Sequence, residues 1–168
     1  MSKRKSRIRG FTLLELLVVI TILVILASAI IVAVGRAQIY ARIKLVEGHL
    51  QLLKGALSRY CDDFGDYPPS DGDGLKGAAS LYECLMTEKK NGPYVKAGDI
   101  PTKDLPTGDT AFADQWKNPI YYLHHHDYGN KPPNKKEYRL IAPGPNGIFE
   151  EGDASSDDIV NWNKAKPE

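Results

Sequence analysis

The stretch that decides the fold runs from Arg9 to Val34 and reads RGFTLLELLVVITILVILASAIIVAV. Its clearly polar residues after Phe11 are Thr12, Glu15, Thr21 and Ser28. About 20 mainly apolar residues allow a helix to cross the hydrocarbon core of a membrane, so the stretch predicts one membrane-spanning helix. Glu15 is unusual in such a helix, because an ionisable side chain inside a membrane is costly unless it is paired.

The charges around this helix predict its orientation. All charged residues before Phe11 are basic: Lys3, Arg4, Lys5, Arg7 and Arg9. Without these five, the 168-residue chain has 17 Lys and Arg (22 minus 5) against 21 Asp and Glu, a formal charge of −4. The positive-inside rule therefore places the N-terminus in the cytoplasm and the C-terminal part across the membrane. This acidic part gives no reason to expect a nucleic-acid partner.

Two ordinary interpretations of the apolar stretch remain open on these grounds. A secretory signal peptide has an apolar core of about 7–15 residues that ends at a small-x-small site, for which residues 27–29 are a weak candidate. An uncleaved anchor fits the longer apolar run better. Neither interpretation explains Gly10 between the basic residues and Phe11, or Glu15 so near the start of the helix.

The segment from Gly10 to Glu15, GFTLLE, followed by an apolar helix, resembles the class III signal of type IV pilins and of the pseudopilins of type II secretion. The resemblance implies that prepilin peptidase cuts between Gly10 and Phe11 and methylates the new N-terminal amine, giving N-methylphenylalanine. It also implies that Glu15 neutralises the Phe11 amine of a neighbouring subunit during assembly. Two opposite charges in a low-dielectric environment are tolerable only as a pair.

Apolar residues continue beyond this stretch at alternating steps of three and four. They are Ile39, Ile43, Val46, Leu50, Leu53, Leu57, Tyr60 and Phe64. This spacing forms one stripe on a helix and predicts a single helix from near Thr12 to near Asp62, about 75 Å long, whose second half packs on a globular head. Gly35, Gly48 and Gly55 interrupt it, either as tolerated defects or as places of close contact or local melting.

The remainder of the chain predicts a small α+β head. Pro and Gly after residue 67 end the long helix, a short helix ends near Thr87, and residues 89–110 have the composition of a loop. The segment from Asp114 to Leu123, DQWKNPIYYL, predicts a turn and a first strand, and residues 138–141 predict a second, with a hairpin loop at 129–134. The Asp-x-Trp-x-Asn-Pro-x-x-Tyr pattern resembles the start of the antiparallel sheet in pseudopilins.

Three consecutive histidines, His124, His125 and His126, raise the question of a metal site. Successive side chains on a strand point to opposite faces, so the three are not expected to converge on one ion. Solvated hairpin residues are the simpler interpretation.

The segment from Ala142 to Trp162 is rich in oxygen-bearing side chains and glycine and contains no Cys or His. Ca²⁺ is usually bound by six to eight oxygen ligands, so this composition suits it, although the EF-hand spacing is absent. The alternative interpretation is an exposed acidic loop that binds no ion. The segment resembles the calcium loop of major type II secretion pseudopilins. The ligands that this resemblance implies are Asp157 and Asp158, carbonyl oxygens near Pro143 and Ile148, and Asn146 where the family usually has Asp, with Asp153 or Glu151 compensating for the lost charge.

Cys61 and Cys84 are the only cysteines. An oxidising compartment allows a disulfide between them, and two buried reduced thiols are the alternative. Their spacing fits no metal-binding pattern.

Taken with these features, the resemblance implies a type IV pilin-like α+β subunit of a type II secretion pseudopilus. The expected segments are a leader at 1–10, a transmembrane and assembly helix at 11–35, and a periplasmic head at 36–168. The expected partners are further copies in a homo-oligomeric filament, minor pseudopilins, the assembly platform of the inner membrane and prepilin peptidase, with structural calcium in the head.

Three other functions are considered. A type IV pilin for adhesion or motility is the nearest, although the long C-terminal disulfide loop that would favour it is absent from the sequence. A membrane-anchored enzyme lacks any nucleophile, base and orienting group at recognisable spacing, so no catalytic residues are expected. A monomeric anchored binding module is the third.

Overall fold

The computed structural model describes residues 12–128, 138–153 and 155–162, apart from the side chains of residues 29–33 and 128. The predicted leader, Phe11 and the hairpin loop at 129–134 lie outside the described residues. The chain divides into two compact units, residues 1–39 and 40–168. The predicted boundary between residues 35 and 36 concerns membrane insertion and stays a prediction.

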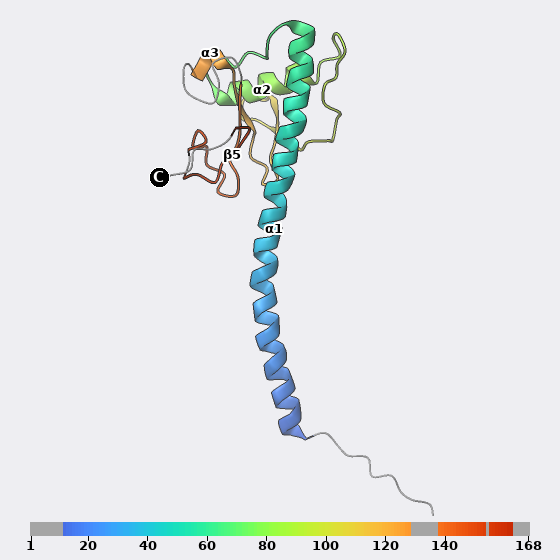
Figure 1. Ribbon diagram of the computed structural model, residues 1–168, viewed down its shortest axis with the longest axis vertical. Coiled ribbons are helices and arrows are strands. Elements are labelled where there is room, and N and C mark those ends of the chain that lie inside the picture. The colour runs from blue at the N-terminus through green and yellow to red at the C-terminus, as the bar shows by residue number, and fades with distance from the viewer. Residues whose placement is uncertain (1–11, 129–137, 154, 163–168) are drawn as a thin grey trace, which may run out of the picture. The chain divides into compact units, whose positions relative to one another are not determined.

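Helix α1, Leu13–Phe64, is a single α-helix and confirms the predicted long helix (Figure 1). In the second unit its apolar stripe forms one wall of the core. Val46, Leu50, Leu53 and Leu57 are buried, Ile43 and Tyr60 are half-buried, and Ile39 and Phe64 at the two ends of the stripe are exposed. The middle turns of the stripe therefore supply the core residues of α1.

Helix α2, Gly74–Leu85, begins at Asp73, whose side chain accepts a hydrogen bond from the Leu75 backbone N–H at 2.8 Å. This N-cap satisfies a donor that the first helical turn leaves unpaired. Leu81 and Leu85 on its inner face share the core with Leu50 and other residues of α1. The helix ends slightly before the predicted Thr87.

The sheet structure is divided in two. Strands β3, Tyr121–Leu123, β4, Arg139–Ala142, and β5, Ile159–Val160, form an antiparallel sheet in that order, with Tyr122 opposite Leu140 and Ala142 opposite Ile159. This confirms the two predicted strands and adds a third, β5. The fold is therefore the predicted α+β arrangement of a long helix and small antiparallel sheets.

The prediction of a loop throughout residues 89–110 was wrong. Strands β1, Thr102–Asp104, and β2, Thr110–Phe112, pair antiparallel within and just beyond that segment. All three residues of β1 are exposed, so the strand has no apolar face that a sequence pattern reveals. Backbone hydrogen bonding to β2, which carries the buried Phe112, holds it in place.

The expected strand geometry at the three histidines was also wrong. Strand β3 ends at Leu123, and a short helix, α3, runs over His125–Tyr128. The backbone N–H of His124 donates to the Ser70 hydroxyl at 2.8 Å, and the Asp127 N–H donates to the His124 carbonyl at 2.9 Å. These bonds turn the chain, so the alternation of a strand does not apply to these residues.

The two cysteines, Cys61 and Cys84, are half-buried free thiols in the structure. Burial, followed by the nearby carboxylates of Asp66 and Asp62, raises the pKa of the Cys61 thiol. The Cys61 thiol is therefore protonated, and less reactive, at neutral pH.

Candidate functional site

The start of α1 is capped by its own side chains. The Thr12 hydroxyl accepts a hydrogen bond from the Glu15 backbone N–H at 3.2 Å. In return, Glu15 Oε2 accepts from the Thr12 backbone N–H and from the Thr12 hydroxyl, both at 3.1 Å. This is a capping box, which the Thr-x-x-Glu spacing signals and which the prediction of an intersubunit role for Glu15 overlooked. Gly10 and Phe11, the predicted processing residues, lie outside the described residues.

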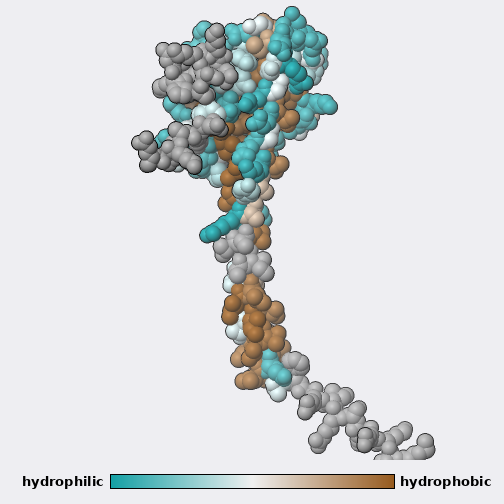
Figure 2. All heavy atoms as spheres, in the orientation of Figure 1, coloured by the Kyte–Doolittle hydropathy of each residue, from teal (hydrophilic) through white to brown (hydrophobic). Residues whose placement is uncertain are grey.

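The first part of α1 presents apolar side chains on all sides. Between Leu13 and Leu26 the exposed fractions of the large apolar side chains range from 45% for Val19 to 85% for Leu13. Figure 2 shows these side chains as an apolar covering of this segment. A helix that is apolar all round is stable only among other apolar groups.

Within the described residues, no helix is both long enough and apolar enough to span a membrane.

The loop between β4 and β5 holds the four predicted calcium ligands, and two of them are in contact. The Asn146 backbone N–H donates to Asp157 Oδ2 at 3.0 Å, and Asn146 Oδ1 accepts from the Ile148 N–H at 2.7 Å. Gly144 permits this close crossing of the chain. It has φ +73°, and a Cβ atom there would lie 2.6 Å from the Asp157 carbonyl oxygen.

The other two predicted ligands bind different partners in the loop. Asp158 is buried, and its Oδ2 accepts from the backbone N–H groups of Gly152 at 2.8 Å and Glu150 at 3.1 Å. Asp153 Oδ2 accepts from the Ser155 hydroxyl at 3.1 Å. The structure therefore brings Asn146 and Asp157 together, while the Asp158 carboxylate binds the backbone of the turn at residues 150–153 and the Asp153 carboxylate binds Ser155.

The donor chemistry of this loop fits calcium. Asp157, Asp158 and Asn146 offer carboxylate and amide oxygens, and Gly144, Gly147 and Gly152 have positive φ, which lets the loop turn tightly. Hard cations such as Ca²⁺ prefer oxygen ligands of this kind. Calcium binding here stays a prediction.

A turn that precedes the sheet supports this loop, a role that the sequence did not suggest. Asp114 is buried, and its Oδ1 accepts from the backbone N–H groups of Trp116 and Asn118, both at 2.8 Å. The Asn118 side-chain amide donates to Asp114 Oδ2 at 3.2 Å and to the Gly144 carbonyl at 3.1 Å. The Asp-x-Trp-x-Asn pattern marked this turn, but only the fold shows that it holds the loop.

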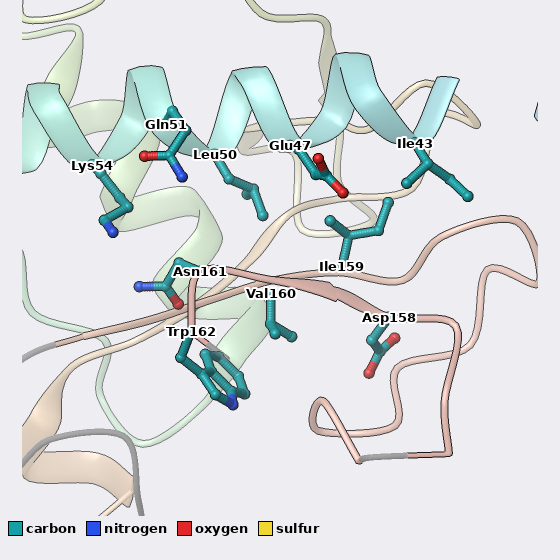
Figure 3. A pocket seen from close by; sticks show the side chains of 10 residues that line it. All are labelled: Ile43, Glu47, Leu50, Gln51, Lys54, Asp158, Ile159, Val160, Asn161 and Trp162. Carbon is teal, nitrogen blue, oxygen red and sulfur yellow. The ribbon is translucent and has the colours of Figure 1, made fainter. Parts of the chain in front are cut away.

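The end of the loop packs back on the head, as predicted. Ile159 is buried in the core, and the Arg139 guanidinium lies 5.2 Å from the centre of the Trp162 ring. Figure 3 shows β5 running beside α1, with a groove between them. The groove is lined by Ile43, Glu47, Leu50, Gln51 and Lys54 of α1 and by residues 158–162. Ordering of the loop is thus coupled to packing of the head.

Known proteins resemble this chain over nearly its whole length. It is 32% identical over 158 residues to the type II secretion system core protein G of Escherichia coli K12. The aligned residues make up 94% of this chain and 93% of that protein. The chain belongs to the type II secretion system core protein G family. The core protein G of Vibrio cholerae O1 is 33% identical and covers 96% of each chain, and that of Klebsiella pneumoniae is 32% identical over 96% of this chain and 99% of that protein.

Two further comparisons each match only part of this member of the core protein G family. The family model described as the prokaryotic N-terminal methylation motif matches residues 5–31. The crystal structure of the major pseudopilin of enterohaemorrhagic E. coli aligns with a TM-score of 0.42 and 20% identity, covering 73% of this chain and 88% of that one. The relatives and the methylation motif identify a pseudopilus subunit of type II secretion in preference to a surface pilin for adhesion or motility.

Proposed function

We propose that this member of the core protein G family enters the pseudopilus through the first part of α1. The observation that carries this proposal is the exposed apolar surface from Leu13 to Leu26. Exposed apolar surface of this extent needs a partner, either lipid or other apolar helices. The same surface serves both environments, so the subunit is stored in the inner membrane and then packs against α1 of neighbouring copies.

Processing precedes assembly. Prepilin peptidase cuts between Gly10 and Phe11 and methylates the amine of Phe11, which the match of the methylation motif to residues 5–31 supports. The new N-terminus then lies a few residues before Glu15. A neighbouring subunit's Phe11 amine pairs with the Glu15 carboxylate, which otherwise caps its own helix through Thr12. The carboxylate thus has a partner both before and after assembly.

Calcium orders the head. Asp157, Asp158 and Asn146, with Asp153 and carbonyl oxygens of the loop, hold the ion, and the ion supplies the positive charge that lets these oxygens approach one another. Asn118 holds one side of the loop through the Gly144 carbonyl, and the Trp162 ring lies against Gly152 on the other. Binding to the folded head alone raises its stability by linkage.

The remaining expectations follow from this role. The chain crosses the inner membrane once, with the basic N-terminus in the cytoplasm and the head in the periplasm, as the positive-inside rule requires. Minor pseudopilins and the inner-membrane assembly platform are its partners besides its own copies. The role is structural rather than catalytic, as it is for the relatives, and filament growth drives protein export.

Complementation tests the function. A strain that lacks the gene for this chain is expected to lose both the pseudopilus and the export of its secreted proteins, and the parent chain restores both. Filaments are detected by immunoelectron microscopy and export by proteomics of the culture medium. Unchanged export together with lost adhesion or motility would instead assign the chain to a surface pilus.

A further inference from the structure

His124, His125 and His126 gather their rings at one place in the head. Each offers a ring nitrogen, and the three nitrogen atoms lie within 4.8 Å of one another. The ring centroids are 4.0–4.9 Å apart. Among the residues that the structure describes, this is the one group of three His, Cys, Asp or Glu side chains close enough to share a metal ion.

The cluster is held by a segment distant in the sequence. Ser70, which follows α1, accepts a hydrogen bond from the His124 N–H at 2.8 Å and donates from its hydroxyl to the Asp127 carboxylate. His124 itself is buried. These bonds fix the backbone on both sides of the histidines, so less conformational freedom is lost when the rings bind a ligand.

A carboxylate lies beside one ring nitrogen of His124. Its Nε2 lies 3.3 Å from Asp66 Oδ1, and its Nδ1 accepts a long bond of 3.4 Å from the His126 backbone N–H. In the tautomer that carries the proton on Nε2, Asp66 accepts that proton in a hydrogen bond, and the lone pair of Nδ1 can bind a metal in place of the long bond from His126. Carboxylates orient metal-binding histidines in this way.

One ring nitrogen of the cluster lacks a hydrogen-bond partner among the described residues. The Nδ1 atom of His125 is buried and forms no hydrogen bond within the described part of the chain. A buried polar atom without a partner is costly and calls for an explanation such as an ion. A metal ion placed among the three rings would give this atom a partner.

We propose that His124, His125 and His126 bind one zinc ion, with Asp66 as the positioning residue of His124. Imidazole nitrogens suit zinc and its neighbours copper and nickel rather than calcium, so this site differs in chemistry from the oxygen-rich loop. Zinc fixes the three rings together beside Asp66 and stabilises the head because it binds the folded state. The site goes beyond the proposed function of the chain in filament assembly.

Titration with zinc tests the proposal. The full-length chain, purified without a histidine tag and kept in mild detergent, is titrated with zinc chloride by isothermal titration calorimetry. We expect one zinc per chain and a higher melting temperature with zinc, because the ion binds the folded state. Zinc affinity should persist in excess calcium. Asp66→Asn should lower zinc affinity about 10- to 100-fold, the usual effect of removing such an orienting group.

Two further variants make the test decisive. His126 is exposed, so His126→Gln should fold normally and lose both zinc binding and the gain in melting temperature. His49 is the fourth histidine and lies on α1, so His49→Gln should keep the zinc affinity of the parent. Equal zinc affinity in the parent, Asp66→Asn and His126→Gln, or no rise in melting temperature with zinc, would overturn the proposal.

Discussion

The side-chain amide of Asn118 donates a hydrogen bond to the carbonyl oxygen of Gly144 at 3.1 Å and so joins the turn before β3 to the predicted calcium loop. The same amide group donates to Asp114, which is buried. Asn118 thus links two segments that are 26 residues apart and positions the backbone of Gly144 beside Asp157.

Loss of this link should weaken both the head and its calcium site. Asn118→Ala removes the bonds to Asp114 and Gly144 and is expected to lower the free energy of unfolding by about 1–3 kcal/mol. Calcium affinity, measured by calorimetry, should fall as well. Asn91→Ala is the matched control, because Asn91 also donates to a carboxylate but lies far from the loop in sequence and bonds Asp63. A calcium affinity unchanged in Asn118→Ala would exclude the supporting role.

Removal of calcium should destabilise the parent chain. We expect a lower melting temperature in a chelator than in calcium, and almost no difference between the two conditions in Asp157→Asn. This variant keeps the shape of the side chain and removes a ligand charge, so the comparison reports on the ion. Asp99→Asn, at an exposed carboxylate outside the loop, should respond to calcium like the parent. A parent chain that melts at one temperature in both conditions would rule out the site.

Glu15 has two roles that separate variants can distinguish. Thr12→Ala removes the hydroxyl of the capping box but keeps the carboxylate, so filaments should still form. Glu15→Gln can still accept the bond from the Thr12 N–H but has no charge for a neighbouring Phe11 amine, so filament yield should fall severely. Immunoblots of membranes and of sheared filaments measure insertion and assembly. Normal filaments from Glu15→Gln would refute the charge pairing.

Gly152 lies where the loop meets Trp162. A Cβ atom there would approach the Trp162 ring to 2.6 Å, and φ is +72°. Gly152→Ala should therefore cost about 1–3 kcal/mol through overcrowding, in addition to backbone strain. Gly108→Ala provides the comparison, since φ is +90° but the Cβ atom would meet nothing within 4 Å. Denaturant unfolding measures the free energy of unfolding of both variants. An equal loss of stability in the two would show that crowding against Trp162 does not destabilise Gly152→Ala.

Acid should weaken the contact between the end of α1 and the segment at Tyr94. The Tyr94 hydroxyl donates to Asp63 at 2.5 Å and the Asn91 amide donates at 2.8 Å, and these bonds lower the pKa of Asp63 below its usual 3.8. A carboxylate whose pKa is lower in the folded state contributes its stability above the unfolded pKa and loses it as pH falls. The free energy of unfolding, measured with urea, should therefore fall less in Asp63→Asn than in the parent as the pH drops below about 4. Parallel pH profiles would contradict this account.

Much of the architecture was predictable because it rests on local periodicity. The apolar run and the stripe through Val46, Leu50, Leu53 and Leu57 predicted α1 nearly to its ends. The β-favouring run near Tyr122 predicted β3. Strand β1 was missed because it is held by backbone pairing with β2 and one bond from the Thr110 hydroxyl to Asp104, and it has no buried side chain.

The sequence by itself therefore determined the long helix, its apolar first part, the short motif around Glu15 and the oxygen-rich composition of the last loop. These properties depend on neighbours within a few turns of the chain. Tertiary structure alone decided that Asn118 holds Gly144 and that three consecutive histidines converge. Both arrangements depend on hydrogen bonds from distant segments, Ser70 in the case of His124, and such bonds leave no periodic pattern in the sequence.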